Sequence, residues 1–154
     1  MEKRFLQQAI AMAMENVHLE GGPFAALVVR EGNVIAAGCN RVTRTNDPTA
    51  HAEMVAIREA CRVLGSFQLT GCDLYSSCEP CPMCLGAIYW ARPARVYFAA
   101  THADAAAAGF DDAFIYEQIA LPGSERSIPM IHVLDPQAAR PFEEWVSLPQ
   151  KTEY

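Results

Sequence analysis

The sequence predicts an α/β protein, a three-layer α/β/α sandwich built on a mixed five-stranded sheet. Segments with helical periodicity alternate with short apolar runs that contain β-branched residues, which is the pattern of helices packed on a sheet. A hairpin near the start of the chain makes the sheet mixed, because the two strands of a hairpin are antiparallel. The 154 residues contain no internal repeat and no low-complexity linker, so we expect a single domain over 1–154.

Two helices and a hairpin are expected in the first half of the chain. Apolar residues recur at helical spacing in the first segment, and Gly21-Gly22-Pro23 ends that helix. The run from Phe24 to Val29 is continuously apolar, which is typical of a strand that is covered on both faces. The expected elements are a helix over 3–18, strands over 24–29 and 34–39, and a helix with Met54, Ile57, Cys61 and Leu64 on one face.

Three strands and three helices are expected in the second half. The periodicity is clear up to position 100 and weaker after it. Pro141 suits the first turn of the last helix, where a missing N–H costs no hydrogen bond. The expected elements are strands over 72–77, 96–100 and 130–134, and helices over 81–91, 111–120 and 141–148.

The composition is that of an ordinary globular protein with an acidic balance. The formal net charge is −6, and the 12 Lys and Arg residues form no basic run, whereas nucleic-acid binders gather such residues on one face. No apolar run approaches the ~18 residues of a membrane span, and no apolar signal segment follows the N-terminus. Six cysteines without such a signal favour a reducing compartment. We therefore expect a cytoplasmic protein that binds neither nucleic acid nor membrane.

Two short motifs carry the chemistry, Thr49-Ala50-His51-Ala52-Glu53 and Glu79-Pro80-Cys81-Pro82-Met83-Cys84. They offer one imidazole and two thiolates to a metal, and a carboxylate that need not bind it. Three protein ligands leave one tetrahedral position open, which distinguishes a catalytic zinc from a structural one. The order His-x-Glu followed by Pro-Cys-x-x-Cys is the signature of zinc-dependent nucleobase deaminases. We therefore expect one Zn²⁺ per subunit, held by His51, Cys81 and Cys84.

Each motif lies at the start of an expected helix. Residues two apart do not share a helix face, so His51 and Glu53 meet only if the metal lies beyond the helix end. The helix dipole lowers the pKa of a thiol at an N-terminus, which suits Cys81 and Cys84 as ligands. We expect the zinc to activate water, and Glu53 to pass the water's proton to the substrate ring and later to the leaving ammonia.

Three other interpretations of the cysteines remain open. Cys78 is evenly spaced with the two motif cysteines, as in iron–sulfur motifs, but position 88 is Ile88 rather than a fourth cysteine. A closed structural zinc would use Cys78 as a fourth ligand and leave Glu53 without a role. The third interpretation is buried cysteines without a metal. We expect Cys78 to serve packing rather than ligation, and His102 to lie in solvent.

Longer segments of the chain resemble one family closely. They are Asn46-Asp47-Pro48-Thr49-Ala50-His51-Ala52-Glu53, the run from Ser77 to Pro93, Ala108-Gly109-Phe110-Asp111-Asp112 and Lys151-Thr152-Glu153-Tyr154. These segments resemble bacterial guanine deaminases of the cytidine deaminase superfamily, and the similarity runs over nearly the whole chain. The resemblance implies the cytidine deaminase-like fold and the hydrolysis of guanine to xanthine and ammonia, with Glu53 as the catalytic proton carrier.

The resemblance also implies roles outside the two motifs. Asn40 would hydrogen-bond the purine, Phe24 would stack on it, Ala52 would contribute to substrate binding, and Asp112 would contact the base or assist proton movement. The residues alone support these roles unevenly. Asn40 ends an expected strand just before the motif loop, which also suits a turn residue, whereas Asp111-Asp112 equally suits helix capping and Phe24 core packing.

The family also forms domain-swapped dimers. The segment 136–154 would then cross to the other subunit of a homodimer, where Tyr154 would close the partner's pocket. An aromatic residue at the end of a chain is usually mobile, so such a role requires that something hold it in place.

Three other functions compete. A tRNA adenosine deaminase and a cytosine deaminase would use the same zinc chemistry on other substrates, and the acidic balance argues against the first. A zinc-binding interaction module without enzymatic activity would leave Glu53 dispensable.

Overall fold

The computed structural model of the chain describes residues 2–110 and 112–154. The chain divides into two compact units, Met1–Ala113 and Phe114–Tyr154. Among the described residues, no helix combines the length and the apolar character that a bilayer span requires.

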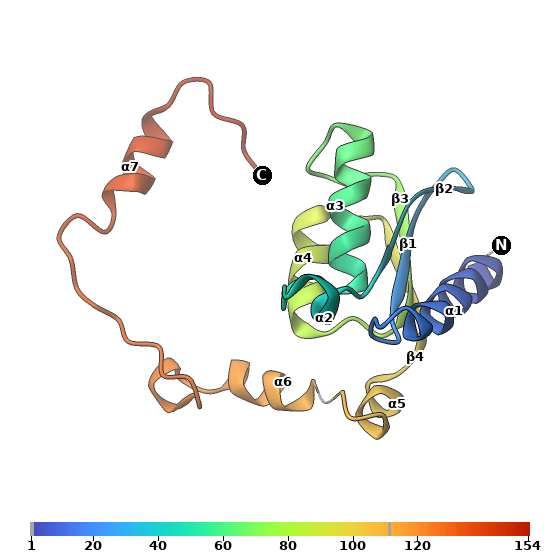
Figure 1. Ribbon diagram of the computed structural model, residues 1–154. Helices are drawn as coiled ribbons and strands as arrows, with labels where there is room; N and C mark the ends of the chain where they lie inside the picture. The colour runs from blue at the N-terminus through green and yellow to red at the C-terminus, as the bar shows by residue number, and fades with distance from the viewer. Residues whose placement is uncertain (1, 111) are drawn as a thin grey trace. The chain divides into compact units, whose positions relative to one another are not determined.

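The first unit is built on a four-stranded mixed sheet with the strand order β2-β1-β3-β4 (Figure 1). The central strand β1 pairs in antiparallel orientation with β2 and β3, and β3 pairs in parallel with β4. The strands are β1 (Ala25–Arg30), β2 (Asn33–Cys39), β3 (Cys72–Cys78) and β4 (Arg95–Ala100). The predicted α/β class, the mixed sheet and the opening hairpin are confirmed.

Helices cover both faces of this sheet (Figure 1). On one face, α1 (Glu2–His18) contributes Phe5 and Ala9 to a cluster with Leu27, Val29 and Tyr75. On the other face lie α3 (Ala52–Leu64) and α4 (Pro82–Ala91), whose buried side chains pack against alternate residues of the same strands, among them Ala26, Val28 and Leu74. Because both faces of β1 are covered, its sequence is apolar at consecutive positions rather than alternating.

The start of α3 lies directly on β2, and Gly38 permits this close approach. A Cβ atom at Gly38 would lie 2.5 Å from the backbone nitrogen of Ala56 and would collide with the carbonyl oxygen of Ala52. Because Gly38 has no side chain, the first turn of α3 can pack closely against β2. This turn carries His51 and Glu53 of the first motif.

Two short helices of the first unit were not expected from the sequence, α2 (Val42–Thr45) and α5 (His102–Ala107). The first turn of α5 is closed by a capping box: the Thr101 hydroxyl accepts from the Asp104 backbone N–H, and the Asp104 carboxylate accepts from the Thr101 N–H at 2.8 Å. A Thr-x-x-Asp sequence is a known helix-start signal, so this element could have been found.

Beyond β4 and α5 the chain forms α6 (Ala113–Ala120), the short 3₁₀ helix η1 (Gly123–Glu125) and α7 (Arg140–Ser147). The expected helix over 111–120 is found from Ala113 onward, and its first expected residue, Asp111, lies outside the described residues. The last expected helix is confirmed within one residue, with Pro141 in its first turn.

The prediction of a fifth strand over 130–134 is wrong for the described chain, whose sheet has four strands. The residues Ile131, Val133 and Leu134 are 82%, 76% and 85% exposed. An extended segment becomes a strand only when its backbone groups pair with a neighbouring strand. The β-branched, apolar sequence has strand propensity, but the sheet of the described residues does not include it.

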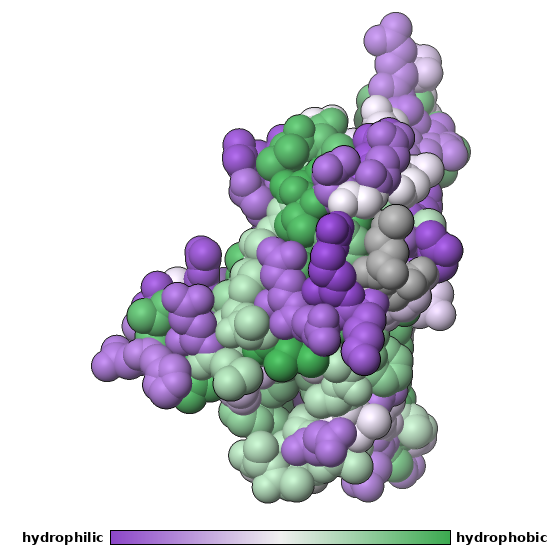
Figure 2. All heavy atoms as spheres, turned by 90° about the vertical axis from the view of Figure 1, so that its right-hand side faces the viewer, coloured by the Kyte–Doolittle hydropathy of each residue, from purple (hydrophilic) through white to green (hydrophobic). Residues whose placement is uncertain are grey.

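The outer surface of the first unit is mixed in character. Along α1, the exposed apolar residues Ile10, Met14 and Val17 lie among polar ones. Figure 2, which views the molecule from the side of α1, shows hydrophilic and hydrophobic residues interspersed on this face.

Candidate active site

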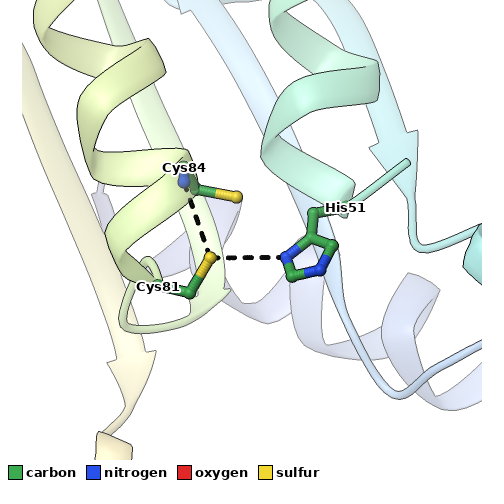
Figure 3. A group of neighbouring side chains, drawn as sticks. All are labelled: His51, Cys81 and Cys84. Atoms are coloured by element: carbon green, nitrogen blue, oxygen red, sulfur yellow. Dashed lines mark hydrogen bonds between the residues drawn. The ribbon is translucent and has the colours of Figure 1, made fainter. Parts of the chain in front are cut away.

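The three expected metal ligands come together at the N-termini of two neighbouring helices (Figure 3). His51 is the N-cap residue of α3, Cys81 is the N-cap residue of α4, and Cys84 lies in the first turn of α4. The Cys81 sulfur lies 3.4 Å from Nδ1 of His51, and one ligand atom from each of the three residues lies within 4.8 Å of the others. The three ligand atoms therefore meet off the helix ends, as the spacing of the first motif requires.

Cys81 and Cys84 are hydrogen-bonded to each other, and each changes the pKa of the other thiol. The Cys81 sulfur accepts a hydrogen bond from the Cys84 backbone N–H at 3.5 Å, and Pro82 occupies the first turn without losing a bond. Hydrogen bonds from the Cys84 thiol and from His51 lower the pKa of Cys81, while the bond to Cys81 and burial raise the pKa of Cys84. Two cysteine sulfur atoms and one imidazole close together form a donor set of the type that binds zinc.

Glu53 lies next to this group and is buried in the first turn of α3. Only 6% of the residue is exposed, and its Oε1 accepts a hydrogen bond from the hydroxyl of Ser76 on β3 at 2.8 Å. Burial raises the pKa of the Glu53 carboxyl, and the bond from Ser76 opposes that rise. A carboxyl group with a raised pKa, fixed in one orientation, is suited to accept and return a proton.

A cavity of about 720 Å³ opens onto these residues, within the first unit. Of the expected substrate-binding residues, Phe24, Asn40, Ala52 and Asp112 line it together with His51, Glu53 and Cys81. Cys84 is fully buried behind them. The remaining lining residues are Val17, Glu20, Gly21, Gly22, Pro23, Val42, Thr43, Cys78, Glu79, Ala105 and Phe110.

Two of the lining residues are fixed by contacts with their neighbours. The Asn40 side-chain oxygen accepts from the backbone N–H of Val42 at 3.2 Å, which starts α2 and orients the amide. The Phe24 ring makes an edge-to-face contact with Phe110, with ring centroids 5.0 Å apart. Phe24 was expected to stack on a purine or to pack in the core, and it contributes to both the cavity wall and the adjoining apolar cluster.

A cluster of charged groups at the rim was missed by the sequence analysis. His102 was expected in solvent, but its side chain is only 32% exposed and lies between two carboxylates. Its Nε2 lies 3.5 Å from Glu79, and its Nδ1 lies 3.7 Å from Asp112. This position follows from α5, the helix that the sequence analysis did not identify.

Cys78 is not among the residues whose ligand atoms come together. The Cys78 thiol contacts the Thr101 carbonyl oxygen at 3.7 Å, and burial, followed by the charge of Glu53, raises the pKa of Cys78 to about 11. Such a thiol stays protonated at neutral pH, which is consistent with packing rather than ligation. Tyr154 lies in the second unit, where its ring contacts Trp145 with centroids 6.2 Å apart.

Comparisons with known proteins identify the fold and the motif. A family model described as the cytidine and deoxycytidylate deaminase zinc-binding region matches residues 1–100. The chain is 56% identical over 151 residues to guanine deaminase of Bacillus subtilis, covering 97% of each chain. It is 44% identical over 96 residues to a tRNA-specific adenosine deaminase of Aquifex aeolicus, which covers 62% of this chain and 64% of the relative.

A solved structure leads to the same family. The X-ray structure of guanine deaminase from Bacillus subtilis matches with a TM-score of 0.97 and 56% sequence identity, covering 99% of this chain and 98% of the other. The match therefore includes the helices that carry His51, Cys81 and Cys84 as well as the sheet beneath them. The chain belongs to the cytidine and deoxycytidylate deaminase family.

Proposed function

We propose that this protein is a zinc-dependent hydrolase that deaminates guanine to xanthine and ammonia. The observation that carries the proposal is the 56% identity to a guanine deaminase over 97% of both chains. Similarity to the tRNA-specific adenosine deaminase covers only 62% of this chain. It therefore supports a common zinc chemistry more than it supports a tRNA substrate for this protein. The cavity of about 720 Å³ is large enough for a single purine base.

In this proposal His51, Cys81 and Cys84 hold one Zn²⁺ per subunit, through the Nδ1 and sulfur atoms that face one another. Zinc, when bound, supplies Lewis acidity that brings the pKa of a water molecule to about 7. The position of Glu53 beside this group suits a proton carrier. Its carboxylate takes a proton from the attacking water and delivers it to the ring nitrogen beside C2. It then takes the remaining proton of the hydroxyl group added at C2 and passes it to the departing 2-amino group, so that ammonia leaves as the C2 carbonyl forms.

The other lining residues would hold the purine during these steps. Asn40 would hydrogen-bond its edge, Phe24 would stack on its face, and Ala52 would contact it near the helix end. Asp112 would contact the base or assist proton movement at the rim. Their shared position in the cavity wall supports these roles.

The assembly and location belong to the same proposal. We infer a homodimer in which 136–154 is exchanged between subunits and Tyr154 closes the partner's pocket. The exposed apolar side chains of the second unit support an interaction surface there. The thiol chemistry of the site suits the reducing conditions of the cytoplasm.

The decisive experiment is ammonia release from zinc-loaded protein with guanine, adenosine, cytosine and a tRNA anticodon stem-loop assayed in parallel. We expect turnover of guanine. Turnover of the stem-loop alone would overturn the proposed substrate while leaving the zinc mechanism intact. No turnover of any substrate would favour a closed structural zinc site or an amine substrate outside this set.

The Glu53→Gln variant tests the mechanism in the same assay. The amide keeps the shape of the side chain but cannot carry the proton, so we expect at least a ~100-fold loss of turnover with the zinc content unchanged. Zinc is measured by atomic absorption on the same samples. Near-normal turnover in this variant would contradict the assignment of Glu53.

A further inference from the structure

Asn16 is a buried polar residue that lies outside the cavity wall yet holds two parts of it. The residue is on the last full turn of α1 and is only 2% exposed. Its side-chain amide Nδ2 donates to the carbonyl oxygen of Gly22 at 2.8 Å and to the carbonyl oxygen of Asn40 at 2.9 Å. One amide group therefore links α1, the loop after it and the end of β2.

Both acceptors belong to the wall of the cavity. Gly22 and Asn40 line it directly. They are also joined through Phe24, whose backbone N–H donates to Gly22 at 2.8 Å and whose carbonyl accepts from the Asn40 N–H at 3.0 Å. The Asn16 amide thus completes a ring of hydrogen bonds through three wall residues. The two side chains proposed to contact the purine, of Phe24 and Asn40, project from this ring.

The double glycine of the loop fits closely around the same two amides. A Cβ atom at Gly21 would collide with the Asn16 amide, lying 2.6 Å from its Cγ atom. A Cβ atom at Gly22 would lie 3.0 Å from Cγ and Oδ1 of Asn40. The loop backbone therefore reaches Asn16 and Asn40 only because it carries no side chains at these two positions. This steric fit supports the hydrogen-bond ring independently of the bond distances.

We infer that Asn16 is a positioning residue for purine binding: it fixes the Phe24 ring and the Asn40 amide through the Gly22 and Asn40 carbonyl groups. The inference rests on the proposed function, because it names the wall that recognises the base. Asn16 contacts neither the substrate nor the metal position. Glu53 and the metal-binding residues are held separately, by α3, α4 and β3, so loss of Asn16 affects substrate binding more than the chemical step.

Asn16→Asp is the most informative variant, because it keeps the size of the side chain and replaces the donor Nδ2 with oxygen. An oxygen atom would then face two carbonyl oxygens, and the ring of hydrogen bonds would open. For zinc-loaded protein and guanine we expect KM to rise by about 10-fold or more, with kcat within about 3-fold of wild type. Gly21→Ala displaces the Asn16 amide without changing it, and we expect the same pattern.

The control for general destabilisation is Leu69→Ala, at a fully buried core position that does not line the cavity. It should lower the melting temperature and leave KM unchanged. A double-mutant cycle with Asn40→Ala tests the route of the effect. If Asn16 acts by orienting the Asn40 side chain, Asn16→Asp should raise KM less in the Asn40→Ala background than in wild type.

Hydrogen–deuterium exchange gives a measurement that does not depend on turnover. In Asn16→Asp, peptides covering 20–26 and 38–42 should exchange faster than in wild type, while peptides of α3 and α4 should be unchanged. Unchanged exchange at these loops, an unchanged KM, or equal losses in kcat and kcat/KM would overturn the inference. Failure of the wild-type protein to turn over guanine would instead remove the proposed substrate, and the exchange experiment would still decide whether Asn16 holds the wall.

Discussion

Ser76 places the most important carboxylate of the site. Ser76 is 1% exposed, and its hydroxyl donates to Glu53 Oε1, so it helps to orient the Glu53 side chain and stabilises its charged form against burial. Hydrogen bonds to charged groups contribute about 1.5–3 kcal/mol, which is enough to matter for the proposed role of Glu53, in which it carries a proton between defined atoms. The role of Glu53 therefore depends on a residue of β3 that no motif contains.

Ser76→Ala should lower kcat for guanine by about 10-fold, because Glu53 loses the partner that orients it. Zinc content should stay unchanged, since Ser76 contacts none of the three ligand residues in the structure. Ser77→Ala is the matched control: its hydroxyl accepts from the Ala25 N–H at 3.0 Å and does not reach Glu53. Steady-state kinetics of the two variants should therefore differ. Equal kcat values would show that the Ser76 bond has no part in catalysis.

At the scale of elements, the packing of α3 on β2 holds the first motif in place. Gly38→Ala should push the start of α3 away from the sheet, because the added methyl group meets the backbone of Ala52 and Ala56. We expect a loss of about 1–3 kcal/mol in the free energy of unfolding, typical of an overpacked contact, and faster loss of zinc to a chelator. The loss of stability and the faster loss of zinc have one cause, the displacement of α3, because His51 is the N-cap residue of this helix.

Gly86→Ala serves as the comparison, because a Cβ atom at this position of α4 meets no described heavy atom within 4 Å beyond its chain neighbours and its own helix backbone. A glycine-to-alanine change inside a helix should stabilise the protein by about 0.5–1 kcal/mol. Denaturant unfolding of both variants measures the difference. If Gly38→Ala proved as stable as wild type, the close approach of α3 to β2 would not be needed to hold the motif.

The capping box of α5 gives the protein a stability that depends on pH. Hydrogen bonds from Thr101 lower the pKa of Asp104 in the folded state below its unfolded value of about 3.9. A lowered folded-state pKa means that the contribution is present above the unfolded pKa and is lost as the pH falls through the folded one. Asp104→Ala should therefore lower the melting temperature at pH 7, and its difference from wild type should shrink below pH ~4. A difference that stayed constant with pH would exclude the ionised carboxylate as its source.

The same elements show which parts could be predicted from the sequence. The motif spacing predicted that His51, Cys81 and Cys84 come together, because ligand spacing is a local property. The strand β1 was predicted because burial on both faces leaves a continuous apolar run. The role of Asn16 was not identified, because its two acceptors are distant in the sequence or lie in an irregular loop. His102 was misplaced because the short helix that positions it depends on a two-residue capping box.

The wrong prediction of a strand over 130–134 concerns the whole molecule, because a strand depends on a partner elsewhere in the fold. The sequence there has strand propensity, but a strand also needs a partner, and its apolar side chains are exposed in the single chain. Contiguous exposed apolar residues of this kind mark interaction surfaces. They agree with the proposed homodimer, which predicts a mass in solution of twice the 16.9 kDa of one chain. Light scattering after size-exclusion chromatography measures it directly.

Exchange of the C-terminal segment has a sharper consequence than dimerisation alone, because each pocket would then combine residues of two chains. Glu53→Gln subunits lack the proposed proton carrier but keep Tyr154, whereas Tyr154→Ala subunits keep Glu53 but lack the ring proposed to close the pocket. In an exchanged heterodimer of the two, one pocket combines an intact Glu53 with an intact Tyr154. Coexpression of the two variants should therefore restore about one quarter of the wild-type activity, although each homodimer alone is impaired.

If Tyr154 instead closes the pocket of its own chain, every pocket in the heterodimer lacks one of the two groups, and mixing restores nothing. The comparison uses point variants only, so both subunits retain the complete segment 136–154 and the same interface. Separately tagged subunits allow the heterodimer to be purified and its zinc content checked before turnover is measured. Restored activity in that fraction would require that the segment cross between subunits, because no arrangement within one chain brings the two intact groups together.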